Sequence, residues 1–265
     1  LDTLKAEGLF HSVPQLGTYY VNINNKVAPF DDVRVRKAFM LAIDPYYLAE
    51  TVTQGTYLPA TNFVGDGFIE ADGSEFSSKQ VVIDRSDYAA NVAEAQKLLA
   101  EAGYPNGEGF PTVSYATNVS GVHVSTAEAL AYMWKENLGV NVEIEQMEWN
   151  VFLAARRNGE HTLARDGWVA DFADPSNLLD LFTSYSGNNS TFYNNAEFDK
   201  LMQEASSTTD LNVHFEKLHE AEKVAFDEAC CVPVYYYATT YICTPEIQNV
   251  TLYPTGEKLF MMATK

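Results

Sequence analysis

The stretch from residue 111 to residue 175 alternates β-prone and helix-prone segments, and this order constrains the fold more than any other feature. Hydrophobic periodicity and breaker residues predict strands and helices in alternation over 112–118, 123–137, 140–147, 149–157 and 162–168. A β-α-β-α-β order implies parallel strands joined by right-handed crossovers, because each helix must return the chain to the starting edge. We therefore predict an α/β fold with a mainly parallel sheet flanked by helices.

Capping and breaker residues place the remaining elements. Asp31 or Asp32 is expected to cap one helix, and Asp44 followed by Pro45 starts another that ends before Gly55. Residues 55–80 have no period and predict a long surface loop. Further helices are expected from Ser86 to Ala102 and over 175–182, 198–205 and 211–229, and further strands over 17–24, 232–237 and, weakly, 250–264.

Charge and composition exclude several classes of partner. The formal net charge of -19 argues against nucleic acid and anionic lipid, since both would be repelled. No basic and apolar leader is visible at the start, so any export signal is expected to be removed or to lie outside this sequence. Three cysteines predict either buried free thiols or one disulfide from Cys243 to Cys230 or Cys231.

Polar and aromatic residues gather where the predicted parallel strands end, which is where such sheets bind ligands. Asp171 is suited to pair with an ammonium group, although Asp171 or Asp174 also suits the cap of the next helix. Arg156 and Arg165 flank the same strand end and suit either a ligand carboxylate or a surface salt bridge. Two further alternatives stay open: His123 as ligand contact or helix-start residue, and Trp149 with Trp168 as site or core residues.

Catalytic and metal-binding patterns are weak. His214 and His219 are five residues apart, which places them on different helix faces, and neither lies in a His-Glu-x-x-His pattern. No nucleophile elbow, Walker loop or dinucleotide fingerprint occurs. We therefore expect no enzyme activity, no cofactor and no metal site. A peptide hydrolase with Asp171 and His123 as acid and base is the alternative of another class, and a protein-interaction module is a third.

Several ordered blocks carry a family resemblance across nearly the whole chain. They are Gly17–Tyr20, Ala28–Ala38 with Leu41–Asp44, Ala95–Gly103, Trp134–Val142, Glu148–Trp149, Ala164–Asp171 and Val232–Tyr237. Together they resemble the bacterial extracellular solute-binding proteins of family 5, the oligopeptide-binding proteins of peptide ABC importers. The resemblance implies a periplasmic-binding-protein-like type II lobe that closes with a second lobe over an extended peptide.

The resemblance also implies a domain plan and a setting. Residues 1–16 would be a remnant of the hinge or amino-terminal lobe, 17–244 the carboxy-terminal peptide-binding lobe, and 245–265 a segment returning to that missing lobe. The expected setting is extracytoplasmic, in the periplasm or lipid-anchored at the outer face of the membrane. The expected partners of the protein are an oligopeptide and the permease subunits of an ABC importer. Other ligands of the family, namely dipeptides, nickel, haem, glutathione and signalling peptides, remain alternatives.

The roles of single residues follow from the same resemblance. Asp171 would bind the peptide α-ammonium, and Arg156, Arg165 and His123 would meet peptide carboxylates. The remaining expected ligand-binding residues line the backbone and side-chain pockets, and are Tyr20, Asn118, Trp149, Gly167, Trp168 and Val169. Thr53 stands where the enteric members of the family have a lysine, and Arg157 stands where they have a histidine. The preferred peptide length and charge of those members are therefore not carried over to this chain.

Overall fold

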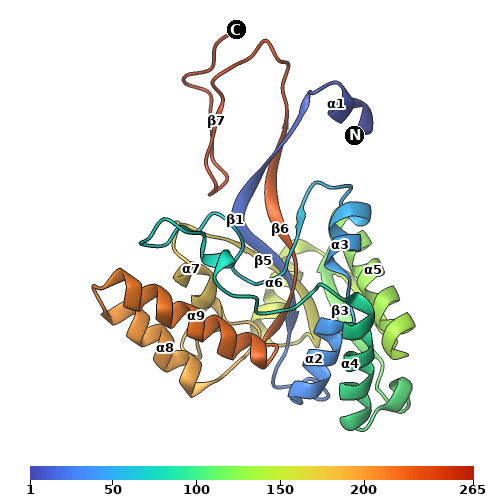
Figure 1. The fold of residues 1–265 in the computed structure, drawn as a ribbon. Coiled ribbons are helices and arrows are strands. Elements are labelled where there is room, and N and C mark those ends of the chain that lie inside the picture. Colours follow the sequence, from blue (N-terminus) through green and yellow to red (C-terminus); the bar gives the residue numbers. More distant parts are fainter.

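A six-stranded sheet forms the centre of the protein in the computed structural model, which describes residues 1–265 (Figure 1). The strands lie in the order β2-β6-β1-β5-β3-β4. Their bounds are β1 Phe10–Ile23, β2 Leu58–Pro59, β3 Val113–Asn118, β4 Val142–Met147, β5 Leu163–Val169 and β6 Cys231–Ile242.

The direction of the strands is mixed. β3 pairs in parallel with both β4 and β5, as the crossover argument predicts. β1 pairs antiparallel with β5 and β6, and β2 pairs antiparallel with β6. The predicted α/β class is confirmed. The prediction that the sheet is mainly parallel is wrong, because β1, β2 and β6 pair antiparallel. The crossover rule covers only the strands within the β-α-β-α-β run, and β1 and β6 lie outside it.

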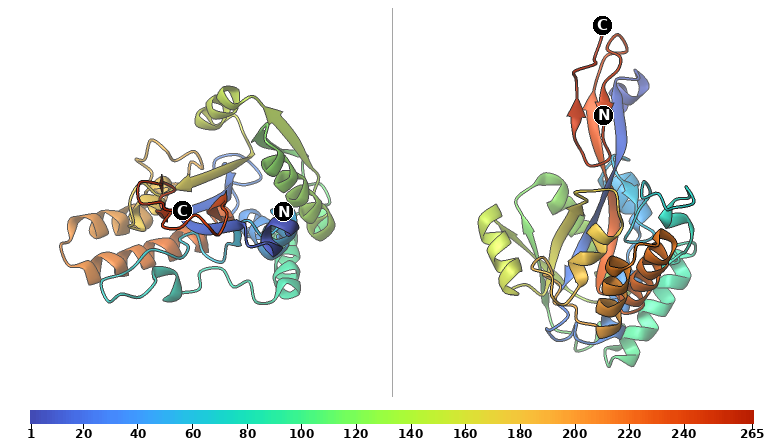
Figure 2. Two further views of the ribbon diagram at one scale, coloured as in Figure 1. Left: turned by 90° about the horizontal axis from the view of Figure 1, so that it is seen from above. Right: turned by 90° about the vertical axis from the view of Figure 1, so that its left-hand side faces the viewer.

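The helices form two groups on opposite sides of the central strands, with α2, α4 and α5 in one and α8 and α9 in the other (Figures 1 and 2). Asp32 caps α2, Asp44 caps α3 and Asp87 caps α4, each by accepting a backbone N–H. The bounds of the helices are α1 Asp2–Ala6, α2 Val33–Leu41, α3 Pro45–Tyr47, α4 Tyr88–Glu101, α5 Gly121–Leu138, α6 Trp149–Asn158, α7 Ser176–Leu179, α8 Ala196–Ser207 and α9 Leu211–Asp227. None of them is both long and apolar enough to span a membrane.

The segment 55–80 differs from the predicted surface loop. It has little regular structure, but its phenyl rings at Phe63, Phe68 and Phe76 are fully or almost fully buried in the main core. The carboxylate of Glu222 on α9 accepts the backbone N–H groups of Phe63 and Val64 at 3.1 and 2.9 Å. Burial raises the pKa of Glu222 to about 7. Glu222 therefore helps to fix this segment to α9, together with the contact between Glu70 and His219.

The two chain ends project from the body of the protein. β1 and β6 continue beyond the sheet as a two-stranded ribbon, and a hairpin of β7 (Thr251–Leu252) and β8 (Lys258–Leu259) lies beside it (Figure 2). Residues 10–16 thus belong to β1. Met261 and Met262 in the terminal segment are 87% and 72% exposed. All three cysteines are free thiols, and Cys230 and Cys231 are buried.

Candidate functional site

The strand β5 positions the largest group of candidate residues. Successive side chains of a strand point to opposite faces, so Asp166 and Trp168 share one face while Arg165, Gly167 and Val169 share the other. Antiparallel pairing with β1 sets Tyr20 opposite Asp166. Position 167 has no room for a larger residue than glycine, because a Cβ there would lie 2.1 Å from the hydroxyl oxygen of Tyr237. The sequence at this strand is therefore restricted by its neighbours on both faces.

A buried ion pair joins α6 to β5. Arg156 Nη1 contacts Asp166 Oδ1, and the side chains are 17% and 6% exposed. The Asp166 carboxylate also accepts Gly167 N–H at 2.8 Å, Asn22 Nδ2 at 3.0 Å and Ser190 Oγ at 3.2 Å. Every oxygen of Asp166 is therefore satisfied, and Arg156 has a carboxylate partner within the protein. Of the two interpretations of Arg156, the structure shows the salt bridge, and it is a buried one.

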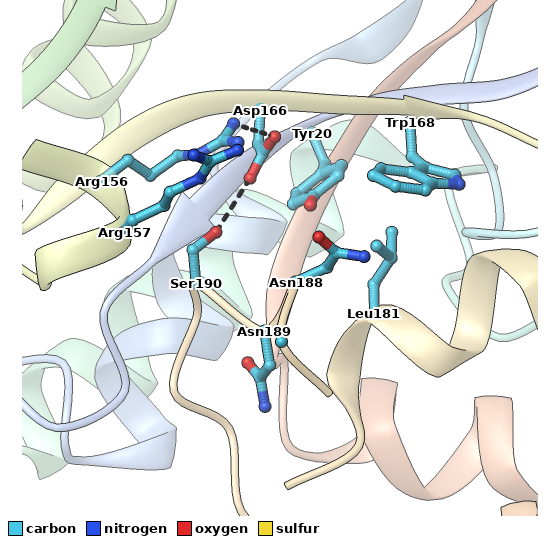
Figure 3. A pocket seen from close by; sticks show the side chains of 10 residues that line it. Tyr20, Arg156, Arg157, Asp166, Trp168, Leu181, Asn188, Asn189 and Ser190 are labelled. Carbon is cyan, nitrogen blue, oxygen red and sulfur yellow. Dashed lines mark hydrogen bonds and ion pairs between the residues drawn. The ribbon is translucent and has the colours of Figure 1, made fainter. Parts of the chain in front are cut away.

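A first cavity of about 200 Å³ opens beside this ion pair. Figure 3 shows Arg156 and Arg157 on one side of it, Trp168 and Leu181 on the other, and Tyr20 between them. Asn188, Asn189 and Ser190 from the segment after α7 close the remaining side. The cavity thus has a charged wall and an apolar wall.

A second cavity of about 310 Å³ adjoins the first, since Trp168, Leu181 and Asn188 line both. Asp171 and Asp180 bring two carboxylates to it. Asn177 Oδ1 accepts both Trp168 Nε1 at 2.9 Å and Asp171 N–H at 3.1 Å, so one amide fixes the indole ring and the loop after β5. An ammonium group is the ligand chemistry that two carboxylates favour.

Asp174, rather than Asp171, contacts the start of the neighbouring helix α7. Asp174 Oδ1 accepts Ser176 N–H at 2.9 Å, and Asp174 Oδ2 lies 3.0 Å from His214 Nε2. The side chain of Asp171 makes no such contact and is exposed. The helix-start interpretation therefore applies to Asp174, and the Asp171 carboxylate is left available to a ligand.

A separate cluster surrounds Arg165. The Arg165 side chain donates from Nε to Asn118 Oδ1 at 2.7 Å, and its guanidinium lies 5.1 Å from the ring centre of Trp149. Arg165 is only 8% exposed and has no carboxylate partner. His123, stacked on Tyr19 at 5.5 Å, has its pKa lowered to about 4 by burial and by the charge of Arg165. A buried, unpaired guanidinium favours an anionic ligand.

The structure thus divides the predicted residues between two places. Tyr20, Arg156, Trp168 and Asp171 gather around the two cavities, whereas Asn118, His123, Trp149 and Arg165 form the other cluster. Both guanidinium groups lie against the ring of Phe152, 5.7 and 5.3 Å from its centre, but Arg156 is paired with Asp166 whereas Arg165 has no carboxylate partner. No group of three or more His, Cys, Asp or Glu side chains is arranged to hold a metal ion.

Sequence reasoning missed the polar network below the first cavity. Its members are Asp166, Asn22, Ser190 and His161, and His161 Nε2 lies 3.0 Å from Asn22 Oδ1. Asp166 stands inside the Ala164–Asp171 block, but its partners are distant in sequence. Only the polar residues Asn22 and Asn24 within a β-prone run signalled that buried hydrogen bonds were needed there.

His161 gives this network a pH dependence. Burial lowers its pKa to about 4, despite the opposing effect of the Asp166 carboxylate. Below pH 6.5 the unfolded imidazole takes up a proton that the folded one does not, so stability falls as the pH falls. We expect His161 to cost about 2 kcal/mol of stability between pH 7 and pH 5.

The measurement is urea unfolding at pH 7 and pH 5 for the wild type and His161→Gln. Glu222 acts in the opposite direction, because above pH 4.5 its folded carboxyl keeps a proton that the unfolded one loses. His123, whose pKa is also lowered to about 4, acts in the same direction as His161, so the wild type alone does not isolate the effect of His161 and the difference between the two proteins does. Equal pH dependence in both proteins would show that His161 is not the titrating group.

Fold and cavities together define an α/β ligand-binding lobe of the type II periplasmic-binding-protein kind. The sequence profile described as "Bacterial extracellular solute-binding proteins, family 5 Middle" matches residues 2–190. The chain belongs to this family, and the predicted resemblance is confirmed.

Curated relatives support the assignment over almost the whole chain. The chain is 33% identical over 264 residues to the oligopeptide-binding protein OppA of Bacillus subtilis, covering 99% of this chain and 48% of that protein. It is 36% identical over 243 residues to periplasmic OppA of Salmonella typhimurium, covering 90% and 43%. The chain therefore spans about half the length of the curated relatives it matches.

Solved structures agree with the fold. Haemophilus influenzae OppA, in complex with the peptide RPPGFSPFR, has a TM-score of 0.81 at 31% identity, over 94% of this chain and 48% of that one. The Escherichia coli murein tripeptide-binding protein MppA has a TM-score of 0.84 at 31% identity, over 96% and 48%. These proteins share the arrangement of elements that carries the two cavities.

Proposed function

We propose that this chain is the peptide-binding lobe of an extracytoplasmic oligopeptide-binding protein that delivers its ligand to an ABC importer. The observation that carries the proposal is the second cavity, in which Asp171 and Asp180 lie beside Trp168 at the end of β5. Similarity to OppA proteins, one of them in complex with a nonapeptide, supports the choice of a peptide as ligand. A lipid anchor and contact with permease subunits belong to the same proposal.

The proposed binding mode uses both groups of side chains. Asp171 meets the α-ammonium of the peptide, while Arg165, held by Asn118 and Trp149, meets a carboxylate farther along. A second lobe supplies the opposite wall, and closure removes the charges from water, which strengthens their pairing. Residues 17–244 form the lobe, and the exposed apolar segment near Phe260 suits the proposed return of residues 245–265 to that second lobe.

A peptide hydrolase has less support. His123 lies against Tyr19 in the Arg165 cluster and does not line the cavity that contains Asp171. An acid and a base must both reach the scissile bond, and these two side chains belong to different sites. Relatives named for dipeptide and haem binding keep another ligand as the alternative within the family.

Asp171→Asn in the full natural protein tests the proposal. We expect peptides with a free amino terminus to bind roughly tenfold to a hundredfold more weakly, since a hydrogen bond to a charged group is worth about 1.5 to 3 kcal/mol. Amino-terminally acetylated peptides should bind the variant and the wild type alike. Isothermal titration calorimetry measures both, and mass spectrometry of the recovered peptides should find them uncut.

Two outcomes count against the proposal. If the wild-type protein binds no oligopeptide, the ligand class is wrong. If Asp171→Asn weakens free and acetylated peptides equally, Asp171 does not meet the ammonium group. Thermal unfolding of the variant serves as the control, and it should match the wild type because Asp174, not Asp171, accepts a backbone N–H at the start of the following helix.

A further inference from the structure

The charges that face the first cavity do not cancel. Two guanidinium groups, those of Arg156 and Arg157, line this cavity together with a single carboxylate, that of Asp166 (Figure 3). Arg156 is the one paired with it, whereas Arg157 is exposed and makes no hydrogen bond or ion pair in the structure. The cavity therefore has one uncompensated positive charge in a protein whose net charge is -19.

Several other polar side chains of this cavity already have partners within the protein. Asp166 and Ser190 belong to the buried network, and the Asn189 amide donates to three backbone carbonyl groups. Asn188 is exposed, and its amide has no partner. Arg157 and Asn188 are thus side chains wholly available to a ligand, beside Arg156, which gives only Nη1 to Asp166, and the apolar wall of Trp168 and Leu181 stands opposite them.

The second cavity has the opposite charge. Asp171 and Asp180 line it, and Trp168 separates this acidic region from Arg157 while lining both spaces. A ligand that fills both cavities must therefore present a cation and an anion a short distance apart, joined by a part that tolerates an indole ring. A peptide with an acidic residue close to its free amino terminus has this chemistry.

We infer that Arg157 makes this site selective for peptides with an acidic side chain near the amino terminus, since the charge of Arg156 is already paired with Asp166. The inference rests on the proposed function and adds a substrate class to it. The carboxylate comes from a side chain, because only a very short peptide would bring its own terminal carboxylate so close to its ammonium group.

The test is calorimetry on the full natural protein with peptides that differ only by Glu, Gln or Lys at one of the first three positions. At the position that reaches the first cavity, Glu should bind about tenfold more tightly than Gln, and Lys more weakly than both. Arg157→Gln should abolish the preference for Glu and leave the Gln peptide almost unaffected. Lys200→Gln is the matched control, since it removes one positive charge from an exposed site on α8 and should preserve the preference.

Each other result overturns the inference. Equal binding of Glu and Gln peptides by the wild type, or equal weakening of both by Arg157→Gln, would refute selectivity while leaving peptide binding intact. Loss of the preference on amidation of the peptide's carboxyl terminus would assign the cavity to the terminal carboxylate instead. Failure to bind any of the peptides would refute the proposed function itself.

Discussion

Asp166→Ala should lower the free energy of unfolding by about 3 to 5 kcal/mol, because removing one partner of a buried ion pair leaves the other charge unpaired. Asp166 is 4% exposed, and it also accepts hydrogen bonds from Asn22, Ser190 and the backbone of Gly167. The substitution leaves these donors without their acceptor as well, which places the expected loss toward the upper end. Urea unfolding at pH 7, followed by circular dichroism, measures it.

Two matched variants make the result interpretable. Asp227→Ala removes a carboxylate from the exposed pair with Lys223 and should leave the free energy of unfolding almost unchanged. Arg156→Met combined with Asp166→Leu should be less destabilised than Asp166→Ala alone, because no unpaired charge remains inside. A loss of less than about 1 kcal/mol for Asp166→Ala would contradict a buried pair.

Local patterns predicted the elements that depend on neighbouring residues. The parallel unit from β3 to β5 was predicted within a few residues, because hydrophobic period and breakers act over short distances. The cap at Asp44 was predicted for the same reason, and Asp32 was one of two candidates for the cap of α2. Asp171 could be singled out because a carboxylate between two aromatics at a strand end is visible in one stretch of sequence.

Long-range pairing could not be predicted in this way. Asn22 and Asp166 are 144 residues apart and meet only because β1 inserts between β5 and β6. The same insertion makes the sheet mixed. Glu222 and the segment 55–80 show a similar limit, since a charged residue on a helix gave no sign that it would fix a distant loop.

The 265-residue chain alone should bind oligopeptides at least about a hundredfold more weakly than the full natural protein. Ligand pockets of useful affinity bury about 70 to 90% of a small ligand's surface. The two cavities here measure about 200 and 310 Å³, and their margins are exposed, with Asp171 in contact with water and Phe172 51% exposed. An oligopeptide on this surface keeps one side in water.

The energetic reason lies in the charges. An ion pair that stays in water contributes roughly 0 to 1 kcal/mol, so Asp171 and Arg157 add little binding free energy on an open wall. Asp171→Asn should therefore hardly change the weak binding of the isolated chain. On closure of the proposed second lobe the same pairs lose water, and the difference of several kcal/mol appears as affinity. Calorimetry with one peptide series on both proteins measures this difference.

Sedimentation velocity checks that the exposed segment around Phe260 and Met261 does not cause self-association that hides the site. A submicromolar dissociation constant for the monomeric 265-residue chain would show that this lobe forms a complete site by itself.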